Sequence, residues 1–312
     1  MPAQRVIDFA VYSLVRVLVC AIQALPPRTC EALSRKLGWF CWEILRLRRK
    51  VVDENLSIAF PEKSSAQREQ IALGMWRHLF LMIMEVAHAP RKLHRTNCRN
   101  YSSSPRMKEV LALLIDERPT VMISGHLGNF EIGGFQLALH GFPTHTIARP
   151  LDNPYLDEFV NRFRGSTGQH MLPKEGSSKA IALLLEQGGT LVLLGDQYAG
   201  NGACWVDFFG KPASTHKAVA LFTLSGSAPT VVSAALRESP FHIVMDVADV
   251  VDPLAENFEL GTVPLLTAWY TKCLEDLVRQ APEQYWWVHR RWKGRPQNRR
   301  DIRRWQRAQQ AA

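Results

Sequence analysis

Residues 119–131 read P-T-V-M-I-S-G-H-L-G-N-F-E, and this stretch decides the fold. The apolar run 120–124 predicts a buried strand, and two glycines flank the tight turn that follows it. A helix is expected over 129–140, with an asparagine as its N-cap. Ligands of open α/β sheets bind at the carboxyl ends of strands. His126 at such an end, with Glu131 in the first turn of the helix, is therefore our candidate catalytic centre.

The spacing of this histidine and this acid is a weak signal by itself. A second His-x4-acid pair, His170 with Glu175, lacks the strand–glycine–helix context, and we interpret it as coincidence. Five residues turn a helix by about 500°, so His126 and Glu131 meet only if the turn folds the histidine back from outside the helix. On spacing alone, a core histidine beside an unrelated helix glutamate remains an alternative.

From residue 107 onward the pattern alternates between helix and strand. It predicts one α/β domain with a mixed, mostly parallel central sheet flanked by helices. Strands are expected at 119–124, 144–149, 189–195, 229–236 and 241–250, and helices at 107–117, 129–140, 153–165, 177–187, 216–226 and 262–280. Upstream, helices are expected at 28–50 and 64–88, joined by a connection at 53–63.

Two further strand ends carry polar residues. One strand ends in Arg149, whose guanidinium offers a planar fork for a phosphate or an oxyanion, and another ends in Asp196 and Gln197. Carboxyl ends of parallel strands share one edge of the sheet. We therefore expect His126, Arg149 and Asp196 at one rim.

The N-terminus is predicted to associate with a membrane. Residues 6–25 form a mostly apolar stretch long enough to cross a bilayer, but Arg16 lies in its middle, so spanning and interfacial placements both stay open. We divide the chain into an apolar anchor with an amphipathic helix at 1–50, the α/β domain at 51–296 and a basic tail at 297–312.

Charge is concentrated at the other end of the chain. The net charge is +9, and residues 289–312 hold nine Arg and Lys residues against one Asp. A local anionic surface is the expected partner. Four tryptophans interleave with these cations, which also fits single-stranded nucleic acid, but a nucleic-acid binder has no need of the apolar N-terminus. The tryptophans are Trp286, Trp287, Trp292 and Trp305, and the cations beside them are Arg290, Arg291, Lys293, Arg303 and Arg304.

Several chemistries lack their motifs. The six cysteines show no paired or metal-type spacing, which favours free thiols in a reducing compartment, and no metal is expected. Nucleophile-elbow, P-loop and dinucleotide fingerprints are missing as well. A histidine base with no protein nucleophile beside it suits direct attack by a substrate hydroxyl on an activated acyl group.

Six blocks of sequence then resemble the late acyltransferases of lipid A biosynthesis, the lauroyl/myristoyl-transferase family within the lysophospholipid-acyltransferase-like superfamily. They are R-R-K-V-V-D-E-N-L-S-I-A-F-P-E at 48–62, S-G-H-L-G-N-F-E at 124–131, A-R-P-L-D-N-P at 148–154, G-D-Q-Y-A-G at 195–200, F-F-G-K-P-A-S-T at 208–215 and A-P-E-Q-Y-W-W-V-H-R-R-W-K-G-R-P at 281–296.

The resemblance implies a site and a reaction. His126 acts as the general base on the acceptor hydroxyl, and Glu131 orients its ring. The hydroxyl attacks the thioester of an acyl carrier protein or acyl-CoA, without a cofactor, at the cytoplasmic face of the inner membrane. Substrate or oxyanion contacts are assigned to Arg149, Asn129, Arg164, Asp196 and Gln197.

The sequence departs from the family pattern at Gly195, where many relatives have proline, and at 198–200. This loop is expected to shape the acceptor site. A lipid A precursor is the expected acceptor, with a phosphoinositol mannoside or a lysophospholipid as alternatives. A non-catalytic lipid-binding protein of the same fold is the rival function.

Overall fold

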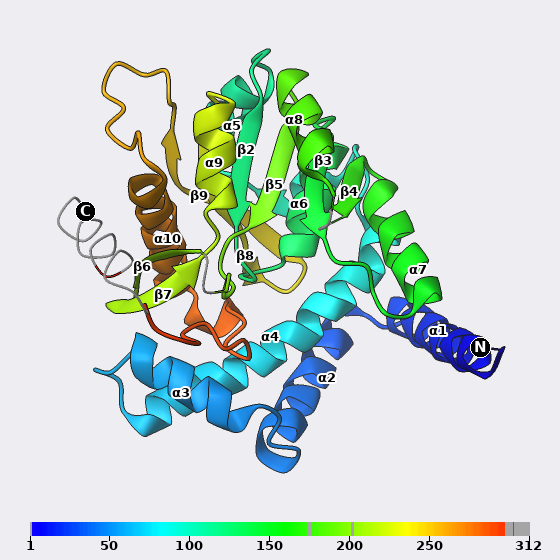
Figure 1. The fold of residues 1–312 in the computed structure, drawn as a ribbon. Helices are drawn as coiled ribbons and strands as arrows, with labels where there is room; N and C mark the ends of the chain where they lie inside the picture. The colour runs from blue at the N-terminus through cyan, green and yellow to red at the C-terminus, as the bar shows by residue number, and fades with distance from the viewer. Residues whose placement is uncertain (1, 174–175, 201–202, 297–301, 303–312) are drawn as a thin grey trace.

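The structure is a computed structural model of the chain and describes residues 2–173, 176–200, 203–296 and 302. Within that part, a seven-stranded sheet of order β1-β9-β8-β2-β5-β3-β4 forms the centre, with helices on both faces (Figure 1). Neighbouring strands run parallel, except that β8 and β9 are antiparallel. The strands are β1 (Ser102–Ser103), β2 (Thr120–Ser124), β3 (Thr144–Ala148), β4 (Gln169–Pro173), β5 (Thr190–Leu194), β8 (Thr230–Ser239) and β9 (His242–Val251). The predicted fold class is confirmed.

The alternation of side chains along β2 explains the two layers of helices. Val121 and Ile123 belong to the main core, together with residues of α8 (Ser178–Glu186), α9 (Ala218–Ser225) and α10 (Val263–Gln280). Met122 points to the other face, where it packs with residues of α5 (Met107–Leu114) and α6 (Phe130–Leu139). A strand covered on both faces is apolar at nearly every position, which is why 120–124 reads as a continuous apolar run.

Helix α4 (Ser65–Lys92) runs along the carboxyl edge of the sheet, with α2 (Pro27–Trp39) and α3 (Arg49–Ala59) beside it (Figure 1). It starts with a capping box, in which Ser64 and Gln67 satisfy each other's backbone N–H groups. This helix therefore closes the edge at which β2 delivers the His126 turn.

The predicted single helix at 28–50 is wrong, and so is the connection at 53–63. Helix α2 continues into a short π-helix at Phe40–Ile44. Positive φ angles at Arg46 and Arg48 then end the helical conformation before α3 begins. Within α3 the buried positions Val51, Val52, Asn55, Leu56 and Ala59 follow helical spacing. That spacing was present in the sequence, but the polar residues between these positions obscured it.

Four short strands were missed, among them the two-residue strand β1. Strand β4 lies at the edge of the sheet and carries His170, and β6 (Cys204–Phe208) pairs with β7 (Lys211–Thr215) in a separate antiparallel hairpin. Glu175, the other half of the coincidental pair, lies outside the described residues.

The N-terminal helix α1 (Pro2–Gln23) is long and apolar enough to cross a membrane, and its apolar window, Ala3–Gln23, is unburied. Two hydrogen bonds connect it to the described part of the protein: Gln23 Nε2 donates to the Ala87 carbonyl at 2.7 Å, and Asn153 Nδ2 donates to the Asp8 carbonyl at 2.9 Å. The rings of Phe9 and Tyr12 also pack against Tyr155. The Arg16 guanidinium lies 5.1 Å from the ring centroid of Phe159 on α7 (Pro154–Gly165). Arg16 thus faces the protein, and the apolar side of α1 is left exposed.

Part of the basic, aromatic C-terminal block belongs to the core. Trp287 is fully buried, and the buried guanidinium of Arg291 donates to the Ser214 carbonyl and to Thr215 Oγ1, both at 2.6 Å. These two side chains are therefore unavailable as a stacking platform for nucleic acid. Trp305, Arg303 and Arg304 lie outside the described residues.

Candidate active site

Strand β2 ends at Ser124, and the next two residues bring His126 against Asp196. The backbone N–H of His126 donates to Asp196 Oδ2 at 3.0 Å, and the imidazole Nδ1 lies 2.9 Å from Asp196 Oδ1. Gly125 permits this approach, because a Cβ at that position would lie 3.2 Å from the Cβ and Cγ of Asp196. Asp196 therefore holds both the backbone and the ring of His126.

Asp196 reaches this position because β5 is the parallel neighbour of β2. The two strands pair in register from Thr120 with Thr190 to Ser124 with Leu194, and Gly195 N donates to the Ser124 carbonyl at 2.9 Å. Two residues past the end of each strand, the side chains of His126 and Asp196 meet. The expectation that His126 and Asp196 share one rim agrees with this geometry.

The Asp196 carboxylate is ionised and fixes the tautomer of the ring. Burial raises its pKa, but the charge of His126 and the hydrogen bonds from that residue outweigh burial and lower the pKa to about 2. A carboxylate only accepts hydrogen bonds, so Nδ1 of His126 carries the proton and donates. The lone pair is then on Nε2, as a general base requires.

The pKa of His126 is raised above its usual 6.5. Burial lowers this pKa. The charge of Asp196, the hydrogen bond to it and the charge of Glu131 raise the pKa by more than burial lowers it. The ring accordingly takes up a proton more readily than a free imidazole does.

Aromatic side chains enclose the ring. The indole of Trp286 stacks on it with a centroid separation of 5.3 Å and an interplanar angle of 3°, and Phe130 meets it edge-on at 5.2 Å. The backbone N–H of Trp286 donates to the His126 carbonyl at 3.0 Å. This contact was not predicted, and its only signal in the sequence was the W-W-V-H block at 286–289.

Gln197 lies over the accessible side of the ring. Its Nε2 is 3.4 Å from Nδ1 and 3.3 Å from Nε2 of His126. Gln197 therefore lies beside both ring nitrogens and leaves the lone-pair direction of Nε2 to the substrate. This placement is compatible with the substrate contact predicted for it.

Glu131 does not contact the His126 ring, which differs from the predicted pairing. It forms a bidentate ion pair with Arg164 of α7, with distances of 2.9 Å from Nε to Oε2 and 2.5 Å from Nη2 to Oε1. The first turn of α6 points Glu131 toward α7, while the turn before α6 points His126 toward β5. Glu131 acts on His126 only through its charge.

The remaining predicted residues divide into buried and exposed ones. Asn129 is fully buried: it caps α6 by accepting from Ile132 N at 3.2 Å and donates to Glu85 at 2.8 Å, so it is not exposed to substrate. Arg149 is at the carboxyl end of β3, but its side chain is 78% exposed and pairs with Asp152 on the surface.

An apolar cavity of about 120 Å³ lies between α6 and the sheet, and its wall includes Ser124, the last residue of β2. Phe130, which touches the His126 ring, contributes to its wall, and the Glu131–Arg164 pair also borders it. Most of the wall is apolar or glycine: Met122, Ile123, Gly133, Gly134, Leu137, Ile147, Ala148, Met171, Val192, Leu194, Ala234, Ala235 and Met245. Such a cavity fits a hydrocarbon chain.

A second cavity of about 510 Å³ lies farther along the same face of the sheet, bordered by α5, α6 and the segment 102–104. The two cavities share the side chains of Met122, Leu137, Ser233 and Met245 as part of their walls. Among the described residues, no group of three or more His, Cys, Asp or Glu side chains is arranged to hold a metal ion.

Comparison with known proteins shows the family to which the chain belongs. The sequence model described as bacterial lipid A biosynthesis acyltransferase matches residues 2–294. The chain belongs to this family.

This acyltransferase is similar to characterised members along most of its length. It is 25% identical over 280 residues to the lipid A biosynthesis lauroyltransferase of Escherichia coli (strain K12), covering 88% of each chain. It is 24% identical over 272 residues to the palmitoleoyltransferase of the same organism, covering 85% of each. It also matches a crystal structure of the 1-acyl-sn-glycerophosphate (LPA) acyltransferase PlsC from Thermotoga maritima, with a TM-score of 0.38 and 10% identity over 84% of this chain and 99% of that one.

Proposed function

We propose that His126 is the general base of acyl transfer from a thioester to a hydroxyl of a lipid A precursor. The observation that carries the proposal is the His126–Asp196 pair, which leaves Nε2 of the neutral ring unprotonated, while Phe130 connects the ring to the wall of the apolar cavity. Relatives named lauroyl-, palmitoleoyl- and myristoyltransferases of lipid A biosynthesis support the substrate class.

The chemistry follows from this geometry. Nε2 of His126 takes the proton of the acceptor hydroxyl as its oxygen attacks the thioester carbonyl. The new C–O ester bond forms, the C–S bond breaks, and the leaving thiolate takes up the proton from the imidazolium. Asp196 stabilises the imidazolium between these two steps, and the donor's hydrocarbon chain occupies the apolar cavity. An acyl carrier protein or coenzyme A carries the donor.

The predicted polar contacts have separate roles in this proposal. Gln197, beside the ring nitrogens, binds the acceptor hydroxyl. The exposed guanidinium of Arg149 is free to exchange Asp152 for a phosphate group of the glycolipid. Arg164, paired with Glu131 at the cavity, fixes the side of α6 along which the acyl chain enters.

The surface at the catalytic edge fits an amphiphilic substrate. Helix α1 and the segment after α2 lie at the end of the molecule where α4 closes the sheet (Figure 1). Exposed apolar side chains gather on them: Val6, Ile7, Phe9, Leu14, Val17, Leu18, Trp39, Phe40, Ile44, Leu45 and Leu47. We propose that this end rests on the cytoplasmic face of the inner membrane, from which the glycolipid enters.

The direct test is an assay of the purified full chain in detergent micelles. Labelled acyl groups are supplied on acyl carrier protein or on coenzyme A, and a lipid A precursor, a phosphoinositol mannoside or a lysophospholipid serves as acceptor. We expect one added acyl ester on the lipid A precursor, detected by mass spectrometry. Acylation of only one of the other acceptors would replace the proposed substrate. Lipid binding without any transfer would favour the non-catalytic alternative.

Replacement of Met245 by alanine is expected to shift the preference toward longer acyl chains. Met245 contributes to the walls of both cavities, so its removal joins them. Each further methylene that becomes buried contributes about 0.8 kcal/mol, which is about fourfold in kcat/KM. The measurement is kcat/KM for donors of increasing chain length.

Met107→Ala is the matched control, because Met107 borders only the second of the two cavities. It removes the same side chain without opening the shared wall, and the chain-length preference is expected to stay as in the wild type. An unchanged preference in Met245→Ala would show that the donor chain does not run toward the second cavity.

A further inference from the structure

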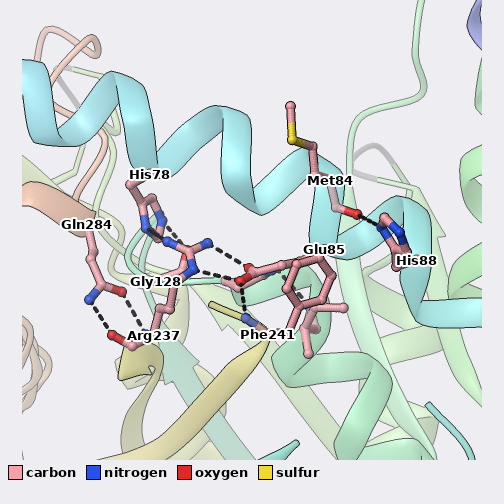
Figure 2. Close-up of polar contacts among 10 residues, drawn as sticks. His78, Met84, Glu85, His88, Gly128, Arg237, Phe241 and Gln284 are labelled. Atoms are coloured by element: carbon pink, nitrogen blue, oxygen red, sulfur yellow. Dashed lines mark hydrogen bonds and ion pairs between the residues drawn. The ribbon is translucent and has the colours of Figure 1, made fainter. Parts of the chain in front are cut away.

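A buried ionic network joins α4 to β8 beside the catalytic turn (Figure 2). It consists of Glu85 and His78 on α4 and Arg237 on β8, and we refer to these three residues as the α4–β8 network. Arg237 donates from Nε to Glu85 Oε1 at 2.7 Å and from Nη2 to Glu85 Oε2 at 2.6 Å. The two side chains are only 4% and 9% exposed, and their charges cancel.

The contact with Arg237 fixes the tautomer of His78. A guanidinium only donates hydrogen bonds, and Arg237 Nη1 donates to Nδ1 of His78, so that nitrogen is unprotonated. The other nitrogen, Nε2, therefore carries the proton and donates to the Gly128 carbonyl at 3.1 Å. Burial and the charge of Arg237 hold the pKa of His78 well below its usual 6.5, so the ring remains neutral.

Glu85 makes the second contact with the turn. Its Oε2 accepts from Nδ2 of Asn129 at 2.8 Å, while Oδ1 of Asn129 caps α6. The network thus binds two consecutive residues, Gly128 and Asn129, which follow His126 by two and three positions.

The same network reaches His126 from the C-terminal side. Gln284 pairs with the backbone of Arg237 through two hydrogen bonds, of 2.7 and 2.9 Å, and its own carbonyl accepts from Gly128 N at 3.0 Å. Two residues later, Trp286 stacks on the His126 ring. The backbone of the turn also lies close to β8, since a Cβ at Gly128 would be 2.0 Å from the Ala235 carbonyl oxygen.

We propose that His78 and Glu85 are positioning residues for His126, holding the turn so that the imidazole faces Asp196 and directs Nε2 at the acceptor. The proposal rests on His126 being the general base. Stability is a weak explanation for this network, because a buried ion pair rarely recovers more than the cost of removing its charges from water. Positioning is a stronger one, because a displacement of about 1 Å at a reacting group costs on the order of 10²-fold in rate.

Two substitutions at His78 separate positioning from a purely structural role. In His78→Gln the amide nitrogen reaches the place of Nε2 and keeps the donor to Gly128, whereas the acceptor for Arg237 is lost. In His78→Asn the amide oxygen takes the place of Nδ1 and keeps the acceptor for Arg237, whereas the donor to Gly128 is lost.

We expect kcat to fall about tenfold or more in His78→Asn, with KM nearly unchanged, and to stay within about twofold of wild type in His78→Gln. A purely structural role predicts the reverse order, with the damage in His78→Gln. Thermal unfolding of both variants reports the folded fraction, against which kcat is normalised. Wild-type kcat in His78→Asn, or equal losses in the two variants, would overturn the proposal.

A readout that does not depend on activity separates this inference from the proposed function. In ¹⁵N NMR spectra of the imidazole groups, recorded at a pH above the raised pKa of His126, wild-type His126 is expected to show a protonated Nδ1 and an unprotonated Nε2. His78→Asn is expected to show a mixture of tautomers, and His78→Gln the wild-type pattern. If His126→Ala retained full activity while these spectra changed as expected, the proposed base would be wrong and the positioning contact would stand. Identical His126 signals in all three proteins would refute the positioning contact.

Discussion

Replacement of His126 by alanine is expected to lower turnover by about 10²–10⁴-fold, as loss of a general base typically does. The reason is specific to the geometry. Nε2 of His126 is the unprotonated nitrogen of the neutral ring, and Asp196 and Trp286 hold the ring in one orientation. The measurement is kcat with a saturating thioester donor and a lipid A precursor as acceptor.

His170→Ala is the matched control for this experiment. His170 is the other histidine with an acid five positions later, but it lies exposed on the edge strand β4. Wild-type turnover is expected in this variant, and circular dichroism checks that both proteins are folded. Near-full activity in His126→Ala would end the proposal that an imidazole base drives the reaction.

Asp196→Asn is expected to lower kcat by about 10²-fold or more, because the wrong tautomer of the base is then favoured. An asparagine has one oxygen, whereas Asp196 accepts from both the backbone N–H and Nδ1 of His126. If the amide NH₂ faces Nδ1, the ring proton moves to Nε2, and the lone pair is lost from the reacting side.

The same substitution is expected to change the pH dependence. The base works only when unprotonated, so kcat/KM of the wild type falls as the pH drops through the raised pKa of His126. Loss of the Asp196 charge lowers that pKa, so the midpoint of the acidic limb moves to lower pH in Asp196→Asn. Profiles of kcat/KM against pH measure this shift.

Glu131→Gln distinguishes between the two carboxylates. Glu131 affects His126 only through its charge and is bonded to Arg164, so a smaller loss of kcat and a smaller shift of the midpoint are expected. If Glu131→Gln had the larger effect on both quantities, the carboxylate favoured by sequence spacing would be the one that orients the base.

Strand β2 and the position of His126 could be predicted because the signals are local. The apolar run 120–124 is covered on both faces of the sheet, and the glycines after it permit the turn. The partner of the histidine could not be predicted from spacing, because it depends on register. Asp196 is 70 residues away and reaches His126 because β5 pairs with β2 residue for residue.

Contacts between elements far apart in the chain could not be predicted from the sequence patterns. Glu85 and His78 lie in the helix predicted at 64–88, and only the fold shows them against Gly128 and Asn129. Short strands such as β4 were missed because a strand of five residues, mostly half-exposed and at the edge of a sheet, has little periodicity. Arg149 was predicted at the carboxyl end of β3, and it lies there. The strand pattern does not predict the direction of its long, exposed side chain.

The stacking of Trp286 on His126 has a consequence for biosynthesis. The ring, its carboxylate and all the strands of the main sheet come from residues before 252, but the indole that covers the ring comes from a segment made after them. A nascent chain that has released only its sheet from the ribosome therefore has an unfinished centre. We expect activity only after residues 281–296 have emerged and folded back against the turn.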